Sequence, residues 1–148
     1  MLDNYQKNIA TFIHLSTFSR FIIPFGNFIA PTLLWIMNKD KSMFIDKHGK
    51  AVINFQISIF LYTVLLGMVT VPFFFYNIFS GFEFIDFQMA ESFHFNFSEL
   101  FSLVFLGSVL IGLAIIGFII ELTLIILASL KAKDGEEFQY PLTIHFIK

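Results

Sequence analysis

The chain has 148 residues, of which 57% are hydrophobic and 14% are charged, and its formal net charge is -2. Soluble domains contain roughly 45 to 50% apolar and about 25% charged residues, so this composition excludes an ordinary soluble domain. The chain has no cysteine, which excludes disulfides, thiol catalysis and Cys-based metal sites. It also has no basic block that could neutralise a row of phosphates, so nucleic acid is not an expected partner. We expect one membrane domain over residues 1–148, with the lipid bilayer as its main partner.

The first apolar stretch covers about residues 9–37 and is interrupted by Pro24, Gly26 and Pro31. Each proline removes a backbone donor and disfavours the α conformation in the residue before it, so we predict a break at Pro24 to Asn27. Two halves of about 15 residues would each reach only ~22 Å, which is shorter than the ~30 Å hydrocarbon core. The pattern therefore favours one broken span or a re-entrant pair, and it leaves the side of the N-terminus open.

The segment at residues 38–50 and the C-terminal tail share a bias towards lysine. Together they hold Lys39, Lys41, Lys47, Lys50, Lys131, Lys133 and Lys148. The segment at residues 80–98 has no Lys or Arg. Because short cytoplasmic loops carry the excess of Lys and Arg, we expect loop 38–50 and the C-terminus to be cytoplasmic, in a bacterial inner membrane. Residues 140–147 are expected to form a short strand-like or interfacial peptide.

The sequence Asp46-Lys47-His48-Gly49-Lys50 is the nearest approach to a catalytic motif. His48 could act as a base that the Asp46 carboxylate orients, but this spacing is not a known catalytic signature. The non-catalytic alternative is an interfacial turn in which Gly49 breaks the chain and the lysines contact anionic lipid. The four histidines lie in different segments, so none forms the i, i+4 metal-ligand pair of a helix. We therefore expect no enzyme, no cofactor and no bound metal.

The second embedded element is expected at about residues 51–79, within a run at residues 51–82 that has no charged side chain. Asn54, Ser58 and Tyr62 recur every four residues along it and would form one polar face of a helix. Such stripes commonly join helices through hydrogen bonds in membranes. The alternative is that they line a hydrophilic path, although a path normally needs a more continuous polar face.

The third embedded element is expected at about residues 99–130 and contains Glu121. Gly107, Ala114 and Ala128 recur with Glu121 every seven residues, so the acid lies on a stripe of small residues that faces another helix. Arg20 is the charged residue of the first stretch. The specific hypothesis is an ion pair between Arg20 and Glu121. The alternative is that Arg20 extends to the headgroups while Glu121 is protonated or bonds to its neighbours.

Several short motifs together resemble a family of small bacterial membrane proteins of unknown function. The motifs are His14-Leu15-Ser16, Ile23-Pro24-Phe25-Gly26-Asn27, Ala30-Pro31, Leu34-Trp35, Phe44-Ile45-Asp46-Lys47-His48-Gly49-Lys50, Asn54-Phe55-Gln56, Gly135-Glu136 and Tyr140-Pro141-Leu142. The resemblance covers about residues 14–147. That family is distantly similar to the channel-forming inner-envelope subunit of the chloroplast protein import translocon.

The resemblance implies an all-α integral membrane helical bundle with about three embedded elements and no assigned catalytic residue. It implies a translocon-like or scaffolding protein that assembles with copies of itself or with other membrane proteins. The break at Pro24 to Asn27, including Gly26, and the loop at Asp46 to Lys50 would shape its cytoplasmic half.

Two other functions stay open from the sequence. One is a small-solute or ion conductor that uses the polar residues Asn27, Asn54, Gln56 and Glu121. The other is a membrane enzyme that uses His48.

Overall fold

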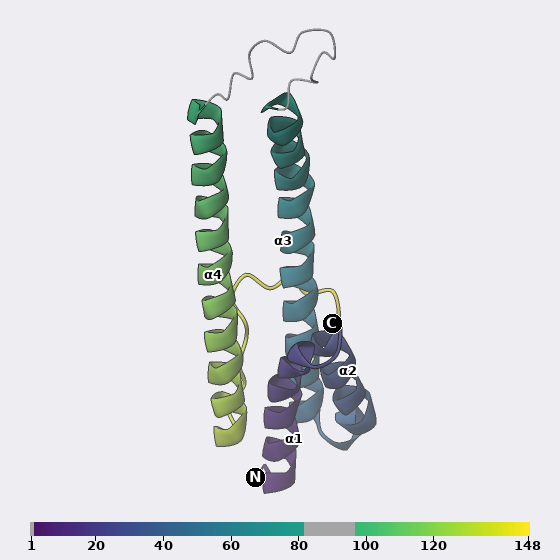
Figure 1. Cartoon of the computed structure of the whole chain (residues 1–148). Coiled ribbons are helices and arrows are strands. Elements are labelled where there is room, and N and C mark those ends of the chain that lie inside the picture. The colour runs from purple at the N-terminus through teal and green to yellow at the C-terminus, as the bar shows by residue number, and fades with distance from the viewer. Residues whose placement is uncertain (1, 82–96) are drawn as a thin grey trace, which may run out of the picture. The chain divides into compact units, whose positions relative to one another are not determined.

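The computed structural model describes residues 2–81 and 97–148 (Figure 1). Its elements are α1 (Asn4–Leu15), η1 (Ser16–Phe21), α2 (Gly26–Asn38), η2 (Lys39–Lys41), α3 (Met43–Gly81) and α4 (Phe97–Asp134). These elements are α- or 3₁₀-helices, and the described part of the chain contains no strand. The prediction of an all-α fold is confirmed. Residues 82–96, which make up most of the segment without Lys or Arg, lie outside the described residues.

Among the described residues, two helices are long and apolar enough to cross a membrane. They cover Met43–Tyr76 in α3 and Val104–Asp134 in α4, with 34 and 31 residues. At 1.5 Å per residue, each exceeds the ~30 Å hydrocarbon core. Only 6% and 11% of their most apolar windows are buried inside the protein, so these helices are not the core of a soluble domain. The second and third embedded elements of the prediction lie within α3 and α4.

The first apolar stretch does not form a third spanning helix. Residues 9–37 are divided among α1, η1 and α2, and the chain turns between Phe21 and Gly26. Phe25 has a left-handed backbone with φ 59°, and a Cβ on Gly26 would lie 2.5 Å from the Ser19 carbonyl oxygen. The predicted break is therefore present, but α2 begins at Gly26 and Asn27 is helical. A bundle of three spanning elements is not confirmed.

The Lys-rich segment at residues 38–50 is not a loop. Its first part is η2, and α3 begins at Met43, so Asp46 to Lys50 form early turns of this helix. Gly49 lies inside this helix and does not break the chain. Its backbone lies against Trp35 of α2. A Cβ at Gly49 would come within 2.1 Å of Trp35 Cδ1. The glycine is needed for the close approach of two helices, and packing outweighs its low helix propensity.

The described chain falls into two compact units. Unit 1 contains residues 1–61 and 119–148, and unit 2 contains residues 62–118. The core of unit 1 combines residues from α1, the start of α3, the end of α4 and the tail. Its fully or nearly fully buried members are Ile13, Ile45, Val52, Phe55, Ile125, Ala128 and Tyr140. In unit 2 the described side chains are mostly exposed and apolar, as lipid-facing residues are.

The tail after α4 packs against α3. Gly135, with φ 86°, ends α4, and the Glu136 amide donates to the Lys131 carbonyl oxygen at 2.9 Å. Farther on, Asn54 Oδ1 accepts hydrogen bonds from the amides of Phe146 and Ile147, and Asn54 Nδ2 donates to the Ile147 carbonyl oxygen. One asparagine side chain thus satisfies the tail backbone as a neighbouring strand would. In Figure 1 the yellow tail runs from α4 to α3.

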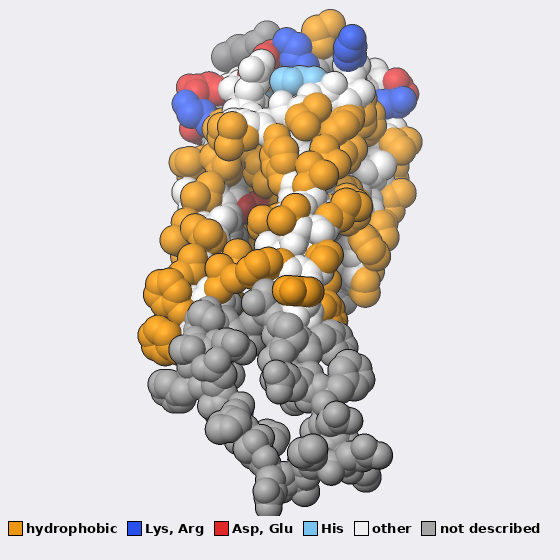
Figure 2. Space-filling view, turned by 90° about the horizontal axis from the view of Figure 1, so that it is seen from above, with side chains coloured by type: hydrophobic (Ala, Val, Ile, Leu, Met, Phe, Trp, Pro, Cys, Tyr) orange, Lys and Arg blue, Asp and Glu red, His pale blue; other side chains and the backbone are white. Residues whose placement is uncertain are grey.

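Three ion pairs of unit 1 are exposed or partly exposed. Lys47 pairs with Glu137, Lys50 with Asp46, and Lys131 with Glu136. Figure 2 shows blue and red side chains gathered at one end of the view, with orange hydrophobic side chains covering the surface beside them. This arrangement suits a polar surface at the edge of a bilayer.

Candidate functional site

Unit 1 contains many buried polar side chains for a protein of this size. They include His14, Thr17, Asn38, His48, Asn54, Gln56, Ser58, Glu121 and Ser129. Buried polar groups are costly unless they are hydrogen-bonded, so their partners are informative. Four of them, His14, His48, Gln56 and Glu121, take part in two clusters that join elements far apart in the sequence.

The first cluster is built around the ion pair of Arg20 and Glu121. Arg20 lies in η1 and Glu121 in α4, and the guanidinium contacts both carboxylate oxygens, with Nη1 to Oε2 at 3.1 Å. Glu121 is only 5% exposed, whereas the Arg20 side chain is 22% exposed. Two parallel N–H to O contacts fix the geometry of both side chains. The structure therefore contains the ion pair that the sequence suggested.

Two amide side chains extend this ion pair. Gln56 Nε2 of α3 donates to Glu121 Oε1 at 3.5 Å, and Gln56 Oε1 accepts from Asn27 Nδ2 of α2 at 2.8 Å. We call Arg20, Asn27, Gln56 and Glu121 the polar layer. It links η1, α2, α3 and α4 through side chains alone. Three of the residues proposed for a conducting path are thereby bonded to one another.

The second cluster is a buried chain of hydrogen bonds that the sequence did not predict. The Tyr140 hydroxyl lies 2.8 Å from His14 Nδ1, and His14 Nε2 lies 2.8 Å from His48 Nδ1. We call these three residues the histidine relay. They come from the tail, α1 and α3. One sequence feature could have pointed to these three residues. Each lies in one of the motifs that resemble the bacterial family, although the three motifs are different.

Burial keeps two members of this relay, Tyr140 and His14, uncharged. It raises the pKa of Tyr140, and the charge of Glu121 adds to that effect. Burial also lowers the pKa of His14 well below 6.5, with a smaller contribution from His48. At neutral pH the relay therefore contains a phenol and a neutral His14.

The hydroxyl of Tyr140 sets the direction of the relay. Among the described residues its only hydrogen-bond partner is His14 Nδ1, so the buried O–H proton is satisfied only if it points there. His14 then carries its own proton on Nε2 and donates to His48 Nδ1. His48 accepts at Nδ1 and carries its proton on Nε2. That atom is buried and has no hydrogen-bond partner in the described part of the chain.

Asp46 is not the orienting partner of His48. Its Oδ1 accepts a hydrogen bond from Trp35 Nε1 at 2.9 Å, and its Oδ2 pairs with Lys50 Nζ at 2.6 Å. The predicted base and its carboxylate are thus occupied with different neighbours. Asp46 instead joins α2 to α3, beside the close contact of Gly49 with Trp35.

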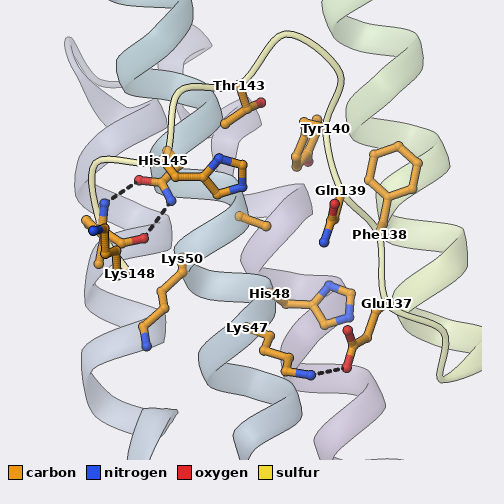
Figure 3. Close-up of a pocket in the computed structure, with 13 residues that line it drawn as sticks. Lys47, His48, Lys50, Glu137, Phe138, Gln139, Tyr140, Thr143, His145 and Lys148 are labelled. Carbon is orange, nitrogen blue, oxygen red and sulfur yellow. Dashed lines mark hydrogen bonds and ion pairs between the residues drawn. The ribbon is translucent and has the colours of Figure 1, made fainter.

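A cavity of about 290 Å³ lies between the start of α3 and the tail, beside His48 (Figure 3). Lys47, Lys50, Glu137 and Gln139 line it together with His48. In Figure 3 the His48 ring points towards Glu137. Within residues 2–81 and 97–148, no group of three His, Cys, Asp or Glu side chains is arranged to hold a metal ion.

Comparisons with known proteins give a family but no individual relative. No curated protein and no solved structure matches the chain. The model of the MamF/MmsF family, described as the magnetosome magnetite crystal formation protein family, matches residues 5–82 and 63–147. This result agrees with the expected family of small bacterial membrane proteins, whereas similarity to the chloroplast translocon subunit is not shown. With two apolar helices and matches over nearly its whole length, the chain belongs to this magnetosome membrane protein family.

Proposed function

We propose that the chain is a non-enzymatic membrane scaffold, held in the bilayer by α3 and α4. The observation that carries this proposal is the polar layer, in which Arg20, Asn27, Gln56 and Glu121 bind one another across four elements. Such a network fixes the arrangement of helices in a medium where unpaired polar groups are expensive. Its construction favours a structural role for these residues over transport.

The family membership suggests the membrane in which this scaffold would act. Its description refers to the formation of magnetite crystals in magnetosomes, and we propose that the chain organises the membrane at which such a crystal forms. Exposed apolar side chains on α2, among them Ile29, Leu33 and Ile36, offer contact surface to lipid, to copies of the chain or to other membrane proteins. A translocon-like role is the narrower form of this proposal, and crosslinking in the native membrane to secretory machinery would support it.

We also propose the orientation expected from the lysines. The ion pair of Lys47 with Glu137 joins residues 38–50 to the tail within unit 1, which supports placing both on one side of the membrane. The Lys-rich side would face the cytoplasm and the membrane would be the bacterial inner membrane.

Liposome flux separates the scaffold from a conductor. Purified wild-type protein should leave ion and small-solute flux at the level of empty liposomes, because the side chains of the polar layer are bonded to one another. The Glu121→Gln variant should behave in the same way. Wild-type flux that is altered by Glu121→Gln would instead establish the conductor and contradict the scaffold.

A further inference from the structure

We propose that the cavity beside His48 binds a phosphate group, carried either by an anionic phospholipid headgroup or by free phosphate. This binding site goes beyond the scaffold function and does not depend on it. The argument combines the size of the cavity, the charge of its walls and a buried hydrogen-bond donor that faces it.

The size and charge of the cavity suit a small anion. Its volume of about 290 Å³ is near the lower end of ligand pockets, which start at roughly 300 Å³. Lys47, Lys50 and Lys148 line it, opposed by the single carboxylate of Glu137. Lysine is a common phosphate ligand, and basic pockets on helical membrane proteins bind lipid headgroups. The walls therefore carry a positive excess.

His48 supplies a donor that the rest of the described protein does not use. The residue is 2% exposed and lines the cavity, and its Nε2 has no hydrogen-bond partner among the described residues. The direction of the histidine relay places a proton on that atom. The Glu136 backbone and the Glu137 carboxylate lie near the ring, but no hydrogen bond of normal distance and angle reaches Nε2. A phosphate oxygen would satisfy this buried N–H.

The walls of the cavity are held in place before any ligand arrives. Asn54 fixes the tail backbone at Phe146 and Ile147. Tyr140 stacks on Phe55 with ring centroids 4.1 Å apart and holds His14 through its hydroxyl. A site whose groups are already ordered loses less entropy when it binds.

Glu137 does not block the site. Its carboxylate pairs with Lys47 at 2.6 Å, but both side chains are at least half exposed. Exposed ion pairs contribute little to stability, so this pair can open when a phosphate group approaches Lys47. Lys50 can contact the phosphate while it keeps its pairing with Asp46, because an ammonium group has three donors.

Binding can be measured on the whole chain in detergent or in nanodiscs. The probes are inorganic phosphate, phosphatidylglycerol as the anionic lipid and phosphatidylcholine as the neutral lipid. We expect phosphate, phosphatidylglycerol or both to raise the unfolding temperature, with phosphatidylcholine as the baseline. A response to phosphate itself identifies a site for the free ion, and a response to phosphatidylglycerol alone identifies a headgroup site.

Two cavity variants and one matched control make this measurement specific. Lys47→Gln and Lys50→Gln should each weaken binding about tenfold, because each removes a charged hydrogen bond to the ligand. Lys133→Gln removes an exposed cation outside the cavity and should bind as the wild type does. Equal losses in all three variants would overturn the proposal, and so would the absence of any response to either anion.

A second measurement uses the unmodified protein and is independent of how the variants fold. In ¹⁵N-histidine NMR, the Nε2 signal of His48 should show a protonated nitrogen and should move as the anion is added. The His145 signal, from a residue that also lines the cavity, is identified separately by its loss in the His145→Gln variant, and the anion is then added to the unmodified protein. A bound anion that leaves the His48 signal unchanged would contradict the role of the relay.

Discussion

Glu121 is the buried carboxylate on which the polar layer of unit 1 depends. Replacing it by Gln leaves the Arg20 guanidinium without its counter-charge, and removing one partner of a buried pair costs about 3 kcal/mol. We therefore expect Glu121→Gln to lower the free energy of unfolding in detergent by about this amount.

A double-mutant cycle checks that the loss belongs to the pair. Arg20→Ala and Glu121→Gln should be non-additive, since each removes the same interaction. Additive losses would mean that the two side chains act independently.

His14 makes the stability of unit 1 sensitive to acid. Burial lowers its pKa below 6.5 in the folded protein, so the unfolded chain takes up a proton at higher pH than the folded chain does. The stability from neutral His14 is full above pH 6.5 and decreases as the pH falls below that value. We expect the unfolding temperature in detergent to fall between pH 7 and pH 5.5.

The exposed His145 provides the control for this pH dependence. His145→Gln should keep the wild-type slope, because this side chain is exposed and takes no part in the histidine relay. An unfolding temperature that stays constant from pH 7 to pH 5.5 would show that His14 is not buried in neutral form.

At the scale of elements, the contact of α2 with α3 depends on Gly49. Alanine is the better helix former by about 1 kcal/mol, but at this position its Cβ would collide with Trp35. We expect Gly49→Ala to lower the unfolding free energy and to shift the fluorescence of Trp35, which is the only tryptophan.

Gly67 lies in the same helix and provides the matched comparison. Nothing lies within 4 Å of a Cβ at Gly67, so Gly67→Ala should leave stability unchanged or raise it. If both substitutions stabilise the protein, α2 does not pack closely against α3.

The elements that sequence reasoning located are those with a strong local signal. The long uncharged run around residues 51–79 corresponds to a spanning helix, and Pro24 with Gly26 marked a break close to its actual place. The structure of the interrupted stretch at residues 9–37 was harder to predict. Its composition suits the membrane, but whether its pieces cross depends on contacts with α3 and α4 that local sequence does not encode.

In the candidate site, too, some features could be predicted from the sequence and others could not. Glu121 and Arg20 stood out because charge is rare in an apolar run, and their pairing could be proposed. The histidine relay joins residues up to 126 positions apart, so no spacing rule revealed it. The docking of the tail could not be predicted from the sequence for a different reason. Asn54 binds backbone atoms of the tail, and these atoms are the same in every residue.

For the whole molecule, the proposed topology can be tested by labelling. The chain has no cysteine, so a single introduced cysteine is a unique probe. In sealed vesicles of the membrane that holds the protein, Lys41→Cys and Ala90→Cys should react from opposite sides, because one spanning helix separates them along the chain. Labelling of both positions from the same side would contradict the two-span arrangement.

The long separation between Arg20 and Glu121 has a consequence for biosynthesis. The two residues are 101 positions apart, so the guanidinium leaves the ribosome long before its carboxylate is made. The early helices must wait at the membrane surface, where water and headgroups can solvate the cation, until the last spanning helix has been inserted. Final assembly is therefore post-insertional, and a chain truncated before α4 would expose an unneutralised arginine to the quality-control machinery of the cell.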